Sequence, residues 1–151
     1  MEWKIKTFDQ LTTLELYDIL KAREEIFIVE QDCPYHDIDS NDHDAIHLFL
    51  EDKSHVVCYL RILGRGVRYH EVSIGRVITR PAYRRRGYGD ELVQRAIHYV
   101  EDVMGERLIR ISAQTYLEEF YGGLGFMRVS EVYLEDGIDH FEMLYQGYYG
   151  Q

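Results

Sequence analysis

The sequence has 151 residues, of which 46% are hydrophobic and 29% are charged, and its formal net charge is −10. This length and composition predict a single globular domain over residues 1–151, and the acidic balance argues against nucleic-acid binding, which needs a broad basic face. No apolar run approaches the roughly 20 residues that cross a bilayer, and the N-terminus MEWKIKTFDQ lacks the pattern of a signal peptide. We therefore expect a cytoplasmic protein without a membrane partner.

Hydrophobic periodicity divides the chain into strands and helices. Segment 11–31 reads as one helix or two abutting helices, with Thr12 or Thr13 as its N-cap. Segment 87–104 is amphipathic, with apolar residues at intervals of four from Leu92 to Met104. The expected strands are 2–8, 46–52, 55–63, 71–80, 107–114, 126–137 and 138–146, and the expected helices are 11–31, 87–104 and 115–125.

This order predicts an α/β fold with a mixed, mostly antiparallel sheet of six to seven strands. Strands 71–80 and 107–114 flank the helix 87–104, and a crossover helix of this kind joins two parallel strands. Ligands of such sheets bind beyond the carboxyl ends of the parallel strands. The stretch RPAYRRRGYG, residues 80–89, lies at such an end.

The stretch RPAYRRRGYG combines clustered arginines, two glycines and the start of a helix. A helix N-terminus exposes about four unpaired N–H groups and a partial positive charge, so it attracts anions. Gly87 and Gly89 let an anion approach the backbone, and arginines are suited to phosphate. The alternative is an ordinary solvated basic turn that leads into a helix. Neither the P-loop spacing nor the dinucleotide-binding spacing of glycines is present.

The sequence resembles the GNAT family of acyl-CoA N-acetyltransferases over nearly its whole length. The spacing Arg84-x-x-Gly87-x-Gly89 between a strand and a helix is similar to motif A of that family, and SAQTYLEEFYGGLGF is similar to motif B. IFIVEQDCPYHDIDSND, IGRV and EDGIDH resemble the ElaA-type branch. The resemblance implies the GNAT fold, with helices on both faces and a splayed central parallel strand pair that holds acetyl-CoA.

The resemblance also implies which residues bind acetyl-CoA. The loop at the helix start would hold the pyrophosphate through its backbone N–H groups, and the preceding strand would bind the pantetheine arm through its backbone. Gln114 departs from the Asn that many members have, which puts its contact in question. The expected cofactor-binding residues are Val77, Ile78, Thr79, Arg84, Arg85, Arg86, Gly87, Tyr88, Gly89, Gln114 and Tyr121.

The implied chemistry is direct attack of a primary amine on the thioester in a ternary complex. Tyr121 matches the family tyrosine that gives a proton to the departing thiolate, although an aromatic residue on a helix more often serves packing alone. A backbone N–H near Ile78 would polarise the carbonyl. The amine must lose a proton, and Glu71 is the expected base. The other candidates for this role are Glu30, Asp39, His47 and His140.

The acceptor is expected to be a small-molecule or peptide amine, drawn by the acidic segment 37–44. Asp37, Asp39 and Asn41 occupy three EF-hand positions, but Asp42 and Leu48 stand where Gly and Glu are required, so we expect no metal. A looser site with His43 and His47 is the weaker alternative to a solvated loop. The expected acceptor-binding residues are Glu30, Tyr35, Asp37, Asp39, His47 and His140.

Three other interpretations remain open to test. A GNAT-fold protein that binds acyl-CoA without catalysis is the main alternative. Nucleic-acid binding through Arg80 and the arginines that follow it lacks a supporting basic face. Cys33 suggests an acyl-enzyme, but only His36 lies nearby to activate it, and Cys33 and Cys58 form no CxxC pair. The sequence is compatible with a monomer or a homodimer.

Overall fold

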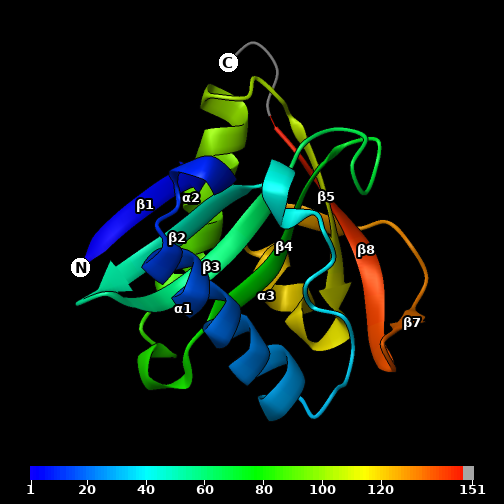
Figure 1. The fold of residues 1–151 in the computed structure, drawn as a ribbon. Coiled ribbons are helices and arrows are strands. Elements are labelled where there is room, and N and C mark those ends of the chain that lie inside the picture. Colours follow the sequence, from blue (N-terminus) through cyan, green and yellow to red (C-terminus); the bar gives the residue numbers. More distant parts are fainter. Residues whose placement is uncertain (148–151) are drawn as a thin grey trace.

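The computed structural model describes residues 1–147, which form one sheet covered by helices (Figure 1). Its eight strands follow the order β1-β2-β3-β4-β5-β8-β6, and β7 also pairs with β8. The strands are β1 (Glu2–Thr7), β2 (Ile46–Asp52), β3 (His55–Leu63), β4 (Val72–Thr79), β5 (Leu108–Gln114), β6 (Phe126–Arg128), β7 (Tyr133–Glu135) and β8 (Ile138–Gln146), and the helices are α1 (Thr13–Arg23), a π-helical segment (Glu24–Glu30), α2 (Tyr88–Asp102) and α3 (Glu118–Gly122).

Helices α1 and α2 cover opposite faces of the sheet (Figure 1). Thr12 caps α1, because its hydroxyl accepts from the Glu15 N–H at 3.0 Å and the Glu15 carboxylate accepts from the Thr12 N–H at 2.8 Å. Two buried clusters match the two faces: one gathers Ile19 of α1 with Phe49 of β2, and the other gathers the apolar stripe of α2 with the alternate strand residues. The predicted helix over 11–31 therefore has an α-helical part and a π-helical continuation.

The parallel pair β4 and β5 is joined by α2, as predicted, and it separates almost at once. Only Val72 with Ile109 and Ser73 with Arg110 are in register, and the strands diverge beyond them (Figure 1). A β-bulge adds to the divergence: β4 has two residues opposite one residue of β3 near Arg76, whose φ is +53°. The splayed parallel pair of the predicted GNAT fold is confirmed.

The sheet has one strand more than predicted, because segment 126–137 is two short strands. Both β6 and β7 pair with β8, through Phe126 with Tyr145 and through Tyr133 with His140. Between them the side chain of Ser130 accepts from the Glu142 N–H at 2.7 Å and interrupts the ladder. A hydroxyl that replaces a backbone carbonyl in this way gives no signal in the hydrophobic pattern.

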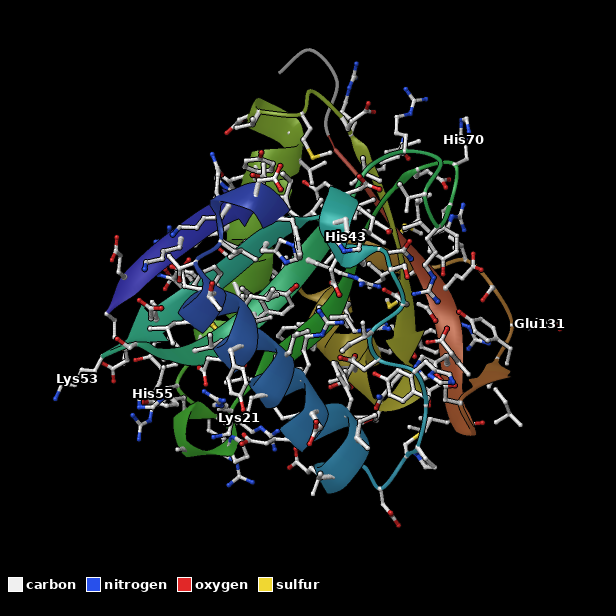
Figure 2. All side chains as sticks on the ribbon, viewed as in Figure 1. Lys21, His43, Lys53, His55, His70 and Glu131 are labelled. Carbon is white, nitrogen blue, oxygen red and sulfur yellow. The ribbon has the colours of Figure 1, made fainter. Side chains whose placement is uncertain are left out.

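Figure 2 shows the side chains on this scaffold. Lys53 and His55 mark the tip of the β2–β3 hairpin, and Glu131 marks the connection between β6 and β7. Within residues 1–147, no helix has both the length and the apolar character needed to cross a bilayer.

Candidate functional site

A cleft of about 860 Å³ opens where β4 and β5 diverge. This volume lies in the range of small-molecule and cofactor sites. One end of the cleft is the start of α2, and the other end lies beside the β7–β8 hairpin. The predicted site residues that line it are Val77, Ile78, Thr79, Arg84, Arg85, Gly87, Tyr88, Gly89, Gln114, Tyr121, Glu30, Tyr35 and His140.

The start of α2 presents unpaired backbone N–H groups to the cleft. Gly87 is the N-cap, and no side chain caps the helix there. Its φ of +83° is a left-handed conformation that favours glycine, and a Cβ there would meet no protein atom within 4 Å. The first intrahelical bond runs from the Glu91 N–H to the Gly87 carbonyl at 3.1 Å. The preceding N–H groups are thus available to an anion.

The arginines before Gly87 have different partners. Arg84 binds both carboxylate oxygens of Glu30 at 2.7 Å and donates from Nε to the Thr79 carbonyl at 2.9 Å. Its hydrogen bonds lower the pKa of Glu30. Arg85 is exposed on the cleft wall, whereas Arg86 is outside the lining and stacks on the Tyr83 ring at 5.8 Å. Arg84 therefore holds the loop in place, and Glu30 is occupied as its partner rather than available as a base.

The two strand ends form the walls of the cleft. Beyond Ser73, β4 has no ladder with β5, so one edge of its backbone faces the cleft, as for an edge strand. Ile78 is 3% exposed as a whole residue and packs in the core beneath α1, and it also belongs to the cleft lining. On the opposite wall, Gln114 Nε2 donates to Gln31 Oε1 at 3.4 Å. This contact joins the end of β5 to the segment after the π-helix.

Tyr121 stands on α3 with its ring packed between aromatic neighbours. The ring centroids of Phe120 and Phe126 lie at 5.0 Å and 5.7 Å. The residue is 6% exposed and lines the cleft. Burial, with a smaller contribution from Tyr116, raises the pKa of the phenol. The raised pKa keeps the hydroxyl protonated, and among the described residues it has no hydrogen-bond partner.

Glu71 and His47 are not in the cleft, which corrects two predicted roles. Glu71 pairs with Arg110 at 2.9 Å, and this hydrogen bond lowers the pKa of Glu71. His47 is fully buried, and its ring nitrogens bond to the Tyr59 hydroxyl at 2.7 Å and the Asp42 carbonyl at 2.9 Å. Burial lowers the pKa of His47. Glu71 is thus part of an ion pair and His47 is part of the core, and neither can reach a substrate in the cleft.

Asp37 and Asp39 also have a different role from the one predicted. They neutralise arginines from three elements: Asp37 binds Arg23 at 2.9 Å and Arg76 at 2.8 Å, and Asp39 binds Arg61. Burial opposes the effect, but hydrogen bonds from Arg61 lower the pKa of Asp39. Asp37 and Asp39 are therefore partners of a cationic cluster, and neither lines the cleft where an acceptor would bind. His43, labelled in Figure 2, lies on the same segment in front of the sheet.

Cys33 lies in the cleft wall, where its thiol donates to the Asp136 carbonyl at 3.1 Å. It is 8% exposed, and His36 beside it in sequence is exposed and lies outside the lining. Burial raises the pKa of the second thiol, Cys58, to about 12. Neither thiol has an activating partner in the described structure, and residues 1–147 contain no cluster of three or more His, Cys, Asp or Glu side chains suited to a metal.

The sequence did not predict the polar group at the far end of the cleft. Glu135 Oε1 accepts from Arg68 at 2.7 Å and from the Ser112 hydroxyl at 2.9 Å. His140 stands beside it, stacked on the ring of Tyr133. The segment EDGIDH contains both Glu135 and His140, and it is the sequence feature that could have pointed to them. The pairing of β8 with β5 and β7 brings Ser112, Glu135 and His140 together.

Comparison with known proteins identifies the family. Residues 16–146 match the model of the acetyltransferase (GNAT) domain, and the chain belongs to the GNAT acetyltransferase family. It is 36% identical to protein ElaA of Escherichia coli (strain K12) over 145 residues, which is 95% of each chain. The crystal structure of E. coli ElaA covers 97% of this chain and 100% of its own, with a TM-score of 0.90 and 34% identity. The resemblance to the ElaA-type branch is confirmed.

A second solved structure supports the same conclusion. An acyl-CoA N-acyltransferase from Pseudomonas aeruginosa is 40% identical, with a TM-score of 0.88, and the match covers 96% of this chain and 99% of that one. An aminoglycoside 6'-N-acetyltransferase crystallised with coenzyme A has a TM-score of 0.70 at 14% identity, and this likeness extends to the fold alone.

Proposed function

We propose that the protein is a cytoplasmic acetyl-CoA-dependent N-acetyltransferase that moves the acetyl group to a primary amine by direct attack in a ternary complex. The observation that carries the proposal is the position of the uncapped N-terminus of α2 at the mouth of a cleft between diverging parallel strands. The chemistry is the general reaction of the family, and an acyl-CoA N-acyltransferase is among the similar proteins.

The donor set fits acetyl-CoA in charge and in shape. The N–H groups around Gly87 suit a pyrophosphate, and Arg85 adds positive charge on the adjacent wall. The free edge of β4 from Val77 to Ile78 suits the amides of a pantetheine arm, which would bind as an added strand does. The Thr79 carbonyl is not open to the pantetheine arm, contrary to what the resemblance implied, because it already accepts a hydrogen bond from Arg84.

Tyr121 supplies the acid that the reaction needs. The amine nitrogen forms a bond to the thioester carbonyl carbon while the carbon–sulfur bond breaks, and the departing thiolate takes the proton of the phenol. Burial raises the pKa of Tyr121, so the hydroxyl is protonated over the whole working pH range, and the proton moves only as negative charge develops on the sulfur. An N–H near Ile78 would stabilise the developing oxyanion. Direct transfer is favoured over an acyl-enzyme because the Cys33 thiol donates to a backbone carbonyl and lacks a base.

Calorimetry with acetyl-CoA tests the proposal. We expect a Kd below about 100 μM and a loss of at least about tenfold in Gly87→Val, since this side chain is strained at positive φ and stands where the anion approaches. Gly105→Val is the matched control, because Gly105 also has a positive φ of +69° and open surroundings but follows the other end of α2. Equal affinities in both variants, or no binding by the wild type, would refute the assignment.

Thiol release over a panel of amines separates the enzyme from the alternative, an acyl-CoA-binding protein without catalysis. The panel contains n-butylamine, amino-acid amides, a tripeptide with a free N-terminus, spermidine and an aminoglycoside. We expect coenzyme A to appear with at least one amine faster than in its absence. Tight acetyl-CoA binding without amine-dependent release across the panel would support the alternative.

A further inference from the structure

From the geometry of the β7–β8 hairpin, we propose that Glu135 and His140 form the seat of the acceptor amine, with Glu135 binding the ammonium and His140 removing its proton. The inference rests on the proposed function and adds the residues that handle the acceptor. It gives a role to the segment EDGIDH, which neither the cofactor loop nor Tyr121 accounts for. Both residues line the same cleft as Tyr121.

The tautomer of His140 is determined by its surroundings. Nδ1 lies 2.7 Å from the Ile138 carbonyl, which can only accept, so Nδ1 carries the hydrogen. The neutral ring then has its lone pair on Nε2. Stacking on Tyr133, with an interplanar angle of 19°, and pairing opposite Gln114 in the β5–β8 ladder hold the ring at the end of β5. A buried imidazole with a defined tautomer and an open Nε2 is the arrangement of a general base.

Hydrogen bonds also fix the orientation of the Glu135 carboxylate. Arg68 and Ser112 both donate to Oε1, and Tyr133 lies 2.6 Å from the Ser112 hydroxyl. Among the described residues no hydrogen bond occupies Oε2, which lies 3.6 Å from His140 Nε2. This separation is beyond a direct hydrogen bond, but one ammonium nitrogen with several N–H groups can bond to both atoms. The carboxylate would hold the amine while the imidazole accepts its proton.

Three other carboxylates line the cleft, namely Glu30, Asp90 and Asp136. Glu30 is held in a bidentate pair by Arg84, and Asp90 accepts from Gln94 at the α2 end of the cleft. Asp136 is exposed on the hairpin turn, whereas Glu135 is half-buried and is oriented by Arg68 and Ser112. The proton balance is complete: the ammonium loses one proton to Nε2 and then to water, the free amine attacks, and Tyr121 protonates the thiolate and regains a proton from the nitrogen as the amide forms.

Steady-state kinetics with the best amine of the panel test the two roles. His140→Asn retains an N–H donor for the Ile138 carbonyl but has no base, so we expect kcat to fall about 100-fold with little change in the amine KM. Glu135→Gln keeps the shape and removes the charge, so we expect the amine KM to rise about tenfold. Asp139→Asn, an exposed residue of the same hairpin, is the matched control. The Kd of acetyl-CoA should stay unchanged in all three.

A binding measurement makes the inference independent of turnover. In protein labelled with ¹⁵N-histidine and saturated with coenzyme A, n-butylammonium should shift the imidazole signals that His140→Asn removes, whereas tetramethylammonium, which has no N–H, should not. Glu135→Gln should abolish the shift and Asp139→Asn should retain it. An unmoved His140 signal, or variants that match the Asp139 control in kinetics, would overturn the inference. Failure of acetyl-CoA binding in the wild type would instead overturn the proposed function.

Discussion

Removal of Asp42 tests the buried ion network on which the acidic segment depends. Its Oδ1 accepts from Arg23 Nη1 at 2.8 Å and from Arg61 Nη1 at 3.0 Å, and the Asp42 side chain is 8% exposed. Breaking a buried pair by removing one partner costs about 3–5 kcal/mol, because a charge is left buried without compensation. In Asp42→Ala each guanidinium keeps a second carboxylate in the network. We therefore expect the lower end of the range, about 3 kcal/mol.

Urea unfolding and thermal melting measure this loss. For a chain of this length, about 3 kcal/mol corresponds to a decrease in Tm of roughly 6–12 °C. Asp44→Ala is the matched control, since Asp44 belongs to the same 3₁₀ turn and is exposed, and we expect a change within about 0.5 kcal/mol. If the two variants unfold at the same urea concentration at pH 7, the energetic reasoning fails.

The effect of Asp42 should also depend on pH in a defined direction. Burial alone would raise its pKa, but the hydrogen bond from Arg23 and the charges of Arg23 and Arg61 lower it. A depressed pKa contributes stability that is present above the unfolded value, about 3.9 for Asp, and is lost as pH falls through the folded pKa. The difference in unfolding free energy between the wild type and Asp42→Ala should therefore narrow below about pH 4. A difference that stays constant to lower pH would contradict the assignment of a charged Asp42.

Two further predictions concern the cofactor side of the cleft. Tyr121→Phe preserves the packing against Phe120 and Phe126 and removes the proton donor, so we expect kcat to fall about 100-fold with an unchanged Tm. Because burial raises the pKa of Tyr121, the kcat of the wild type should not fall near pH 10 through loss of this proton. Replacing Arg85 and Arg86 together by Ala should weaken acetyl-CoA binding about tenfold at low salt. At about 1 M salt, where the Debye length is near 3 Å, the replacement should have almost no effect. A loss of affinity that calorimetry finds independent of salt would show that the two arginines maintain the loop conformation instead.

Sequence patterns were sufficient to predict which residues meet at the α2 end of the cleft, because this part of the cleft is local in sequence. The crossover helix, the strand before it and the loop between them are contiguous from residue 71 to residue 104. The glycine at the helix start and the apolar stripe of α2 are each readable within one or two turns. Even there, the partner of Arg84 was not readable, since Glu30 lies 54 positions away in sequence.

The surroundings of the predicted acceptor residues required the tertiary structure. The segment DIDSNDHD reads as a solvated acidic loop because its charges are consecutive, yet Arg23, Arg61 and Arg76 reach it from α1, β3 and β4 and neutralise it. No local pattern encodes which cation meets which anion. The expectation that Glu71 is a base failed for the same reason, because its partner Arg110 is 39 positions away.

The sequence by itself thus indicated the order of elements, the parallel pair and the glycine at the start of α2, since periodicity and glycine positions are properties of neighbouring residues. The motif resemblance added the family and, through it, the splaying of the parallel pair. Strand register decided the rest. Placing β8 between β5 and β7 brings Ser112, Glu135 and His140 together at one end of the cleft, and placing the acidic segment over three arginines pairs Asp37, Asp39 and Asp42 with them. Such juxtapositions depend on which edges pair in space, and the energy that selects those pairings is summed over the whole sheet and its core.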